Sequence, residues 1–264
     1  MDSANPLALP GALAPAAPAL ARALLLAAGR GERMRPLTDT CPKPLLPVRG
    51  KPLMQWHLEA LQRSGMAPVL INTAWLGEQM EARFGPALAT PGQPPLPLLY
   101  SHEGQDFGGA LETAGGIARA LPRLAEVFWV LAGDVFVPGF EFAAAALQAF
   151  EASDALAHIW LVPNPQHNPA GDFGLDAHGQ ARDLPKDTQA PRWTYSTIGL
   201  YRRALFLPPW CDIAPGNPQG QRAALAPLLR KAMAQGRVTA SLYTGAWTDV
   251  GTPERLQQLN ASHA

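Results

Sequence analysis

Short, continuously apolar runs alternate with helical patterns along the first 150 residues. Runs at residues 23–28 (ALLLAA), 68–72 (PVLIN) and 127–132 (VFWVLA) are apolar at nearly every position rather than at every second one. Such runs predict strands that are covered on both faces, as in a parallel sheet between two helix layers. Segments 52–65 and 110–121 have the helical spacing that would supply those layers. The sequence therefore predicts an α/β fold, a Rossmann-like three-layer α/β/α sandwich with a mostly parallel sheet.

The 264 residues suffice for one globular domain with a buried core, and no internal repeat divides them. Residues 1–21, mostly Ala, Pro and Leu, are expected to be a flexible extension, because their prolines disfavour a helix and they lack the basic start of a secretory signal. Residues 22–264 then form a single domain with halves 22–150 and 151–264, since strands outnumber helices in the second half. The Pro- and Gly-rich segment 85–97 predicts an exposed loop.

The composition argues against several partners and locations. Lys plus Arg and Asp plus Glu both number 21, so the charge balance gives no indication of nucleic acid or an anionic membrane as a partner. Cys41 and Cys211 are the only cysteines and form no CxxC or Cys/His motif, which argues against a disulfide framework or a zinc site. No apolar run approaches the roughly 20 residues of a transmembrane helix. A soluble, cytoplasmic protein is therefore expected.

A glycine-containing loop follows the first predicted strand. Gly29 and Gly31 allow backbone amides to approach an anion closely. The loop is neither a dinucleotide fingerprint, which needs a third glycine where Met34 stands, nor a Walker A motif, which ends in GKS or GKT. Four prolines then disfavour a helix, so a long loop over the sheet edge is expected and a dehydrogenase is disfavoured. These prolines are Pro36, Pro42, Pro44 and Pro47.

The same loop carries the cations Arg33, Arg35 and Lys43. Glycine amides, a guanidinium and an ammonium at the carboxyl end of a central strand can together bind a triphosphate. The alternative is an ordinary turn with solvated basic side chains. A bare GxG would favour that alternative, whereas the complete loop favours the triphosphate.

Two segments of this loop, LAAGRGERMRPLT (residues 26–38) and PKPLLPV (residues 42–48), resemble the signature of the sugar-1-phosphate nucleotidyltransferases. These enzymes join a nucleoside triphosphate to a sugar phosphate and release pyrophosphate. The resemblance extends over nearly all of the chain from residue 22 and implies the nucleotide-diphospho-sugar transferase fold. The first half would bind the nucleotide and the second half the sugar phosphate. The residues implied in triphosphate binding are Gly29, Gly31, Glu32, Arg33 and Lys43, of which Arg33 and Lys43 would neutralise phosphate charge during catalysis.

Two acids could complete such a site. Asp134 follows a buried apolar run, and Asp249 precedes the last predicted helix at Pro253. Either could instead stabilise a turn or a helix N-terminus. Phosphoryl transfer between polyanions, however, requires Mg²⁺, which is usually held by one or two carboxylates together with phosphate oxygens and water. The resemblance implies that Asp134 and Asp249 are this metal-binding pair, with Asp134 also counted as catalytic.

The chemistry expected of this site is direct displacement. A phosphate oxygen of the sugar phosphate would attack the α-phosphorus of the nucleotide in line, and pyrophosphate would leave. The sequence contains no apparent Ser/His/Asp or Cys/His arrangement that would point to a covalent intermediate. None of the six histidines is expected to act as a catalytic base.

The segment ALETAGG (residues 110–116) places Glu112 and Thr113 in the first turn of a helix. An acidic residue there is also an ordinary helix N-terminus, supported by the helix dipole. The resemblance implies that this turn lies near the base and sugar, usually with a glycine where Ala114 stands. Gly133 is expected to let the nucleotide approach, and the alternative is a turn glycine.

In the second half, NPQHNPAGDFGL (residues 164–175) has the composition of a turn. A plain hairpin connection is one explanation. Asn168, Gly171 and Asp172 also offer amide and carboxylate groups that suit sugar hydroxyls. Within the family, the chain most closely resembles the group that couples UTP to N-acetylmuramate 1-phosphate in bacterial cell-wall recycling. That resemblance implies that Asn168, Asp172 and Thr197 lie on the sugar-phosphate side, where Trp247 would either form a wall or be part of the core.

The leading hypothesis is therefore an Mg²⁺-dependent enzyme that makes UDP-N-acetylmuramate and pyrophosphate from UTP and N-acetylmuramate α-1-phosphate. One alternative keeps the chemistry and changes the substrates to mannose 1-phosphate with GTP, or glucose 1-phosphate with UTP or dTTP. Another is a sugar-nucleotide-sensing module without turnover, which the intact charged set disfavours. A monomer is expected, because family members that form larger oligomers mostly carry extra carboxyl-terminal segments and this sequence ends at Ala264.

Overall fold

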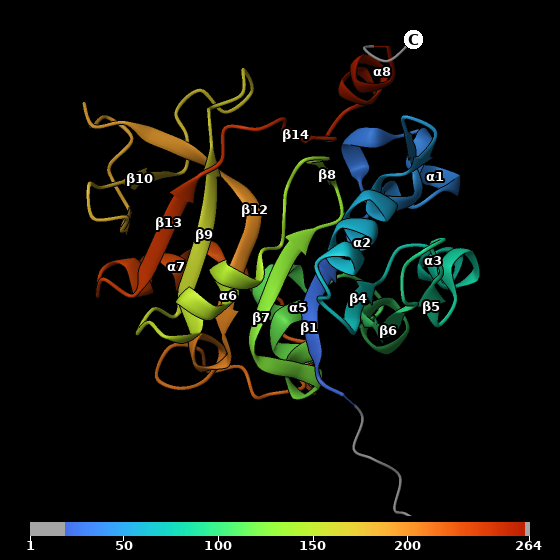
Figure 1. Cartoon of the computed structure of the whole chain (residues 1–264), viewed down its shortest axis with the longest axis horizontal. Coiled ribbons are helices and arrows are strands. Elements are labelled where there is room, and N and C mark those ends of the chain that lie inside the picture. The colour runs from blue at the N-terminus through green and yellow to red at the C-terminus, as the bar shows by residue number, and fades with distance from the viewer. Residues whose placement is uncertain (1–18, 262–264) are drawn as a thin grey trace, which may run out of the picture.

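The continuously apolar runs form the centre of a ten-stranded sheet in a computed structural model that describes residues 19–261 (Figure 1). Residues 1–18, most of the predicted extension, and residues 262–264 lie outside the described part. Strand β1 (Ala21–Leu26) begins at the last residue of the segment predicted as the extension, and Ala21 is fully buried. No helix within residues 19–261 is long and apolar enough to cross a membrane.

Four parallel strands make the middle of the sheet in the order β7 (Leu124–Ala132), β1, β4 (Val69–Thr73) and β6 (Leu96–His102). Their carboxyl ends lie along one edge of the sheet. Parallel strands need long crossover connections, which here contain the helices that cover the sheet. The predicted α/β class is confirmed.

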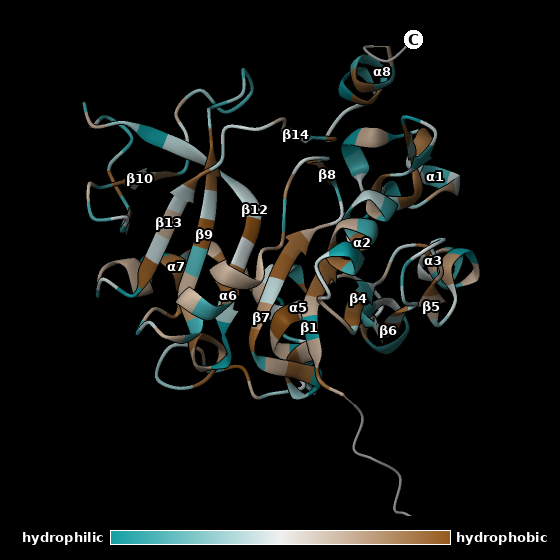
Figure 2. Ribbon diagram, viewed as in Figure 1, coloured by the Kyte–Doolittle hydropathy of each residue, from teal (hydrophilic) through white to brown (hydrophobic). Residues whose placement is uncertain are grey.

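Helices cover both faces, as the continuous hydrophobicity predicts. One face carries α2 (Leu53–Arg63), α3 (Gly77–Phe84) and α6 (Ala144–Glu151), and the other carries α5 (Glu112–Ala120) and α7 (Ala226–Met233). Successive residues of a strand point to opposite faces. On β1, Ala23 and Leu25 therefore belong to the first hydrophobic core and Leu24 belongs to the second. Figure 2 shows the hydrophobic colouring concentrated in β1 and β7.

The second half extends the sheet with mostly antiparallel strands. β12 (Arg192–Arg202) pairs with β7 on one side and with β9 (Ala157–Val162) and β10 (Phe173–Leu175) on the other. β13 (Val238–Leu242) runs parallel to β9, and β11 (Ala181–Arg182) pairs with β10. This arrangement matches the expectation that strands outnumber helices after residue 150. The remaining elements are η1 (Glu32–Met34), α1 (Leu37–Thr40), η2 (Lys43–Leu45), β2 (Pro47–Val48), β3 (Lys51–Pro52), β5 (Ala87–Leu88), α4 (Glu103–Phe107), η3 (Leu121–Arg123), β8 (Val135–Phe136), η4 (Arg203–Phe206), β14 (Thr248–Asp249) and α8 (Pro253–Ala261).

The segment 85–97 is only partly the exposed loop that its composition predicts. Leu88 and Leu96 are buried, and they are paired across β5 and β6 in an antiparallel bridge. The side-chain Nε2 of Gln62 donates to the carbonyl oxygens of Leu88, at 3.3 Å, and of Pro94, at 2.7 Å. Two leucines flanking the prolines supply enough apolar surface to attach the segment to the sheet edge, a tertiary effect that composition does not reveal.

A third apolar cluster, which we call the loop cluster, lies beside the carboxyl ends of the parallel strands. It joins the proline-containing loop to the antiparallel pair of β8 and β14 and to α8. Met34, the residue that stands where a dinucleotide fingerprint has glycine, is fully buried in it. The loop is therefore packed against the sheet, not free in solvent. The loop cluster consists of Met34, Leu46, Val48, Leu53, Phe136, Val250 and Leu256.

We expect the free energy of unfolding to depend on His57, which is 2% exposed and donates from Nε2 to the carbonyl oxygen of Val135 at 2.8 Å. Burial lowers the pKa of His57 from 6.5 to about 4. Between these values the unfolded chain binds a proton that the folded protein does not, so stability is full above 6.5 and is lost as the pH falls towards 4. The loss should reach about 3 kcal/mol.

Urea unfolding of the wild type and of His57→Gln across pH 7 to 4 measures this effect. Gln keeps a donor for Val135 but does not titrate, so the variant should lose less stability over this range. Equal pH slopes for the two proteins would contradict the assignment to His57.

Candidate active site

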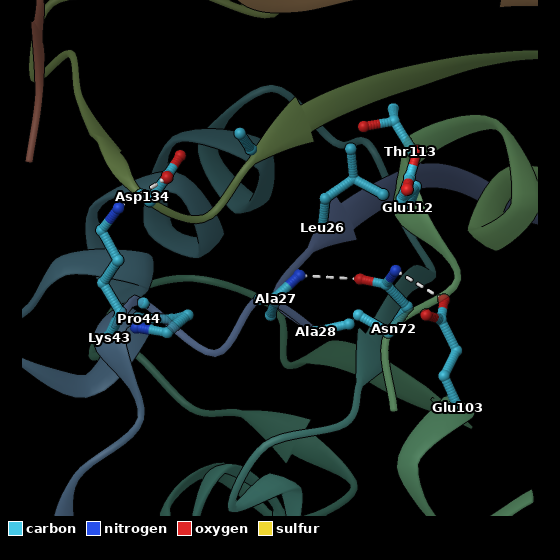
Figure 3. Close-up of a pocket in the computed structure, with 14 residues that line it drawn as sticks. Leu26, Ala27, Ala28, Lys43, Pro44, Asn72, Glu103, Glu112, Thr113 and Asp134 are labelled. Atoms are coloured by element: carbon cyan, nitrogen blue, oxygen red, sulfur yellow. Dashed lines mark hydrogen bonds and ion pairs between the residues drawn. The ribbon is translucent and has the colours of Figure 1, made fainter. Parts of the chain in front are cut away.

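A cavity of about 240 Å³ opens at the carboxyl ends of β1, β4 and β7 (Figure 3). Ligands of α/β proteins bind at this edge of the sheet. The cavity brings together six residues that the sequence singled out and adds two polar residues, Asn72 and Glu103, that it did not. The six predicted residues are Gly29, Gly31, Lys43, Glu112, Thr113 and Asp134.

The glycine loop has the conformation that its sequence requires. Gly31 has a φ of 68° in the left-handed region and precedes the short helix η1. Its carbonyl oxygen accepts from the Met34 amide and from Thr38 Oγ1, both at 2.9 Å. A Cβ atom on Gly31 would lie 3.1 Å from Thr38 Cγ2 and 3.3 Å from Lys43 Cβ, whereas one on Gly29 would meet nothing within 4 Å. Gly31 is therefore needed for backbone conformation and for space, and it sets the position of Lys43.

Lys43 and Asp134 form an ion pair at one side of the cavity, with Nζ 2.7 Å from Oδ2 (Figure 3). Lys43 is only 7% exposed, whereas the side chain of Asp134 is 42% exposed. A buried ammonium requires a partner, because its transfer out of water is costly. The pair thus holds the proline-containing loop against the end of β7 and places an ammonium beside a carboxylate at the wall of the cavity.

Arg33 is exposed and forms no hydrogen bond or ion pair within residues 19–261. It lines a second hollow of about 260 Å³ together with Glu32, and this hollow shares Gly31, Lys43 and Asp134 with the first cavity. Arg35 behaves differently, since its Nε lies 2.9 Å from Asp39 Oδ1 at the surface. Of the two arginines, Arg33 is the one available to an anionic ligand.

The antiparallel pairing of β8 with β14 brings the backbone of Asp249 next to that of Asp134. Asp249 pairs with Val135, and the Val250 amide donates to the Asp134 carbonyl oxygen at 2.8 Å. The Asp249 carboxylate accepts from Arg255, and its Oδ1 lies 2.8 Å from His167 Nε2. These two partners are enough to compensate the charge of the Asp249 carboxylate without a metal ion.

Asp249 does not line either hollow, but each acid keeps one carboxylate oxygen that a metal ion could use. Asp134 Oδ1 and Asp249 Oδ2 each lack a hydrogen-bond partner among the described residues, because the ion pairs use only Oδ2 and Oδ1 respectively. No group of three or more His, Cys, Asp or Glu side chains within residues 19–261 could hold a metal ion. Two carboxylates that rely on phosphate oxygens and water for the other ligands are the usual magnesium arrangement. The metal role of this pair remains a prediction.

Glu112 and Thr113 begin α5 at the rim of the cavity. Glu112 has a φ of 60°, which is uncommon for a residue with a side chain, and its carboxylate lies 3.6 Å from Arg222. The amides of Ala114 and Gly115, which follow Thr113, both donate to the Ala223 carbonyl oxygen, at 2.8 and 3.1 Å. A carbonyl from the second half of the chain thus occupies two of the donors in the first turn of this helix.

Two glycine-related expectations of this region have structural explanations. Ala114 is fully buried in the second hydrophobic core, so its methyl group packs away from the cavity. The Gly133 amide donates to the Leu26 carbonyl oxygen at 2.8 Å, and a Cβ atom on Gly133 would lie 3.0 Å from that oxygen. The contact between β1 and the end of β7 accounts for this glycine, and a role in nucleotide binding remains a prediction.

Asn72 and Glu103 are the site residues that sequence reasoning missed. Asn72 is 3% exposed and Glu103 is fully buried, and Asn72 Nδ2 donates to Glu103 Oε1 at 2.7 Å (Figure 3). Burial raises the pKa of Glu103, although hydrogen bonds from the Leu111 amide and from Asn72 oppose the shift. The available signal was a single polar residue at the end of the apolar run PVLIN, where a strand enters the ligand-binding edge.

The predicted sugar residues Asn168, Gly171 and Asp172 lie together beside β12 but do not line the cavity. Asn168 Nδ2 donates to Asp172 Oδ1 at 3.2 Å, and Asp172 Oδ2 accepts from the Tyr195 amide at 2.8 Å. Gly171 has a φ of 61°, as a turn glycine often does. These bonds attach the loop to β12, which is what a hairpin connection needs, and a sugar-binding role stays a prediction.

Thr197 lies where the pairing of β12 with β9 is irregular, between Tyr195 and Gly199. Its φ of 66° is rare for a β-branched residue. Trp247 is partly buried against the first core, and its Nε1 donates to the Ser196 carbonyl oxygen at 3.1 Å. Trp247 therefore supports the irregular segment, and a sugar-phosphate role for Thr197 stays a prediction.

Comparison with known proteins gives one family. A family model described as nucleotidyl transferase matches residues 22–264. The N-acetylmuramate alpha-1-phosphate uridylyltransferase of Neisseria meningitidis serogroup B is 46% identical over 242 residues, which are 91% of this chain and 97% of that protein. The enzyme of the same name from Caulobacter vibrioides is 30% identical over 250 residues, 88% of this chain and 92% of its own.

More distant similarity supports the fold. The catalytic subunit beta of mannose-1-phosphate guanylyltransferase from Drosophila melanogaster is 29% identical over 88% of this chain and 60% of its own. A Bacillus anthracis protein named for glucose-1-phosphate thymidylyltransferase activity and crystallised with sucrose superposes with a TM-score of 0.71. It has 19% identity over 91% of this chain and 94% of its own, which speaks for the fold alone.

Gly31→Ala should destabilise the protein by about 1–2 kcal/mol, because alanine is unfavourable at a positive φ and its methyl group would press on Thr38 and Lys43. Thermal unfolding of this variant beside Gly29→Ala measures the effect. A methyl group on Gly29 would meet no atom within 4 Å, and its φ is not positive, so the Gly29 variant should unfold close to the wild-type temperature. Equal losses in both variants would contradict the requirement for glycine at position 31.

Proposed function

Because the chain belongs to the nucleotidyl transferase family, we propose that it transfers the uridylyl group of UTP to N-acetylmuramate α-1-phosphate, releasing pyrophosphate, as a step of peptidoglycan recycling. The observation that carries this choice of substrates is the 46% identity to the Neisseria meningitidis enzyme over nearly the full length of both chains. A cytoplasmic location and a monomeric state remain predictions.

The arrangement of charges supports nucleotidyl transfer. A phosphate oxygen of the sugar phosphate attacks the α-phosphorus of UTP, a new P–O bond forms, and the bond to the β-phosphate oxygen breaks. Lys43 lies between the two hollows, where its ammonium can stabilise charge on the phosphates, and Arg33 can reach the same anion from the second hollow. Catalysis then consists of positioning and charge neutralisation.

Asp134 and Asp249 would hold Mg²⁺, and their free carboxylate oxygens make them suitable ligands. When bound, this ion supplies a positive charge that neutralises and orients phosphate oxygens. The Lys43 ammonium holds the Asp134 carboxylate in place before any ligand arrives. Glu112 and Thr113, which line the other end of the cavity, would contact the base and ribose, and Gly29 and Gly31 would allow backbone amides to approach the triphosphate.

The alternative substrates differ in the sugar and the base, not in the reaction. Incubation of the protein with Mg²⁺, a panel of nucleoside triphosphates and a panel of sugar 1-phosphates tests them by pyrophosphate release. We expect turnover with UTP and N-acetylmuramate α-1-phosphate. A preference for GTP with mannose 1-phosphate, or for UTP or dTTP with glucose 1-phosphate, would replace the proposed pair. No release with any pair would support the sensing module.

Asp134→Asn should lower the rate of pyrophosphate release about a hundredfold or more, because it removes a carboxylate that would hold Mg²⁺ against the phosphate oxygens. The single substitution leaves the buried Lys43 ammonium unpaired, and comparison of its folding with that of Lys43→Met/Asp134→Asn measures the effect of this unpaired charge on stability. Asp154→Asn, which changes an exposed carboxylate outside the cavity, should retain wild-type turnover. Circular dichroism establishes that each variant is folded. Wild-type activity in folded Asp134→Asn would remove Asp134 from the catalytic set.

A further inference from the structure

We propose that Asn72 and Glu103 are positioning residues for the nucleotide, because they fix the glycine loop and the turn before α5 at one separation. This inference rests on the proposed function only in that the cavity must bind a nucleoside triphosphate. Neither side chain needs to react with the substrate, although both line the cavity.

Three hydrogen bonds form a continuous series that begins at the glycine loop and ends at the turn before α5; Figure 3 shows the first two. The Ala27 amide, at the start of the glycine loop, donates to Asn72 Oδ1 at 2.7 Å. Asn72 Nδ2 donates to Glu103 Oε1 at 2.7 Å, and the Leu111 amide donates to Glu103 Oε2 at 2.8 Å. This series of hydrogen bonds therefore connects the residue after β1 with β4, with α4 and with the residue immediately before Glu112.

Burial makes these three bonds sensitive to substitution, because the buried groups have no other hydrogen-bond partners in the described part of the chain to replace them. Glu103 is fully buried, and no cation contacts its carboxylate within residues 19–261, so the hydrogen bonds from Asn72 and Leu111 are its main compensation. A buried acceptor that loses one of its donors costs more than an exposed one. The Asn72 amide also has a fixed orientation, since its oxygen faces one donor and its nitrogen faces one acceptor.

A glycine on α5 makes room for the pair. A Cβ atom on Gly116 would lie 2.6 Å from Glu103 Oε1 and 3.0 Å from Asn72 Nδ2. Gly116 does not line the cavity, so its role in ETAGG is to admit the carboxylate beneath the helix. Gly115 has a separate reason, because a Cβ atom there would lie 2.4 Å from the Gln221 carbonyl oxygen.

Binding of the nucleotide should depend on this connection, because the phosphates and the base of the nucleotide would contact opposite sides of the cavity. Ala27 leads into Gly29 and Gly31, which are expected to approach the phosphates. Leu111 leads into Glu112, whose φ of 60° is held by the surrounding structure and not by local preference. Release of either end changes the separation between the phosphate and base sides of the cavity.

Glu103→Gln tests the connection with a nearly isosteric side chain. Gln has one acceptor where two donors must be satisfied, so either Asn72 Nδ2 or the Leu111 amide faces an NH₂ group. We expect the Kd for UTP, measured by calorimetry with Mg²⁺, and the KM for UTP to rise about tenfold. The KM for the sugar 1-phosphate should change much less.

The reciprocal variant Asn72→Asp/Glu103→Gln restores every bond. The introduced aspartate would accept from the Ala27 amide and from the side-chain amide nitrogen of the introduced glutamine. The oxygen of that glutamine would in turn accept from the Leu111 amide. We therefore expect the double variant to bind UTP within about threefold of the wild type, although each single variant is weakened. Gly116→Ala should reproduce the loss seen in Glu103→Gln.

Gln62→Met is the matched control, because it removes a buried hydrogen-bonding side chain that holds the segment 85–97, outside the cavity. It should lower thermal stability without changing the Kd for UTP. Glu103→Gln that binds UTP as the wild type does, or a double variant that fails to fold or is no better than the worse single variant, would overturn the positioning role. Wild-type protein that binds no nucleoside triphosphate would instead refute the proposed function.

Discussion

The ion pair between Lys43 and Asp134 is the interaction on which the site depends. It connects a loop that contains four prolines to the end of the longest parallel strand, at one side of the cavity. Loss of the Asp134 carboxylate would leave the buried Lys43 ammonium without compensation, which is costly, whereas the side chain of Asp134 is 42% exposed and stays in contact with solvent. The apolar loop cluster around Met34 reduces the cost of ordering this loop by packing it against α8 and the antiparallel pair of β8 and β14. Charge and packing therefore fix the same loop from two sides.

Much of the architecture could be predicted because it follows from local composition. The apolar runs of β1 and β7 identify buried parallel strands, and the prolines after Gly31 exclude the helix that a dinucleotide-binding loop would need. The cavity also gathers Gly29, Lys43 and Asp134, which the family resemblance had grouped together. Segments with strong local patterns were predicted correctly, since their neighbours in space only reinforced them.

The remainder depends on contacts between distant residues. Nothing local to Asn72 or Glu103 indicates that they meet, since they are 31 positions apart on β4 and α4. The short strand β5 forms because Leu88 finds an apolar partner on β6, which overrides the loop composition around it. Of the two partners of Asp249, His167 likewise comes from a distant segment, whereas Arg255 lies only six positions further along the chain. Single polar residues and short apolar pairs acquire their roles only from the fold.

The carbonyl group of Ala223 has a consequence for how the chain holds together. It accepts from the amides of Ala114 and Gly115 in the first turn of α5, and the strand β12 pairs with β7. Two elements of the 22–150 half, α5 and β7, are therefore completed by residues after 190. A fragment that stopped at residue 150 would leave buried backbone donors and a bare sheet edge, neither of which water could satisfy without loosening the core. The 22–150 and 151–264 halves are thus parts of one cooperative unit, which we expect to fold and melt as a whole.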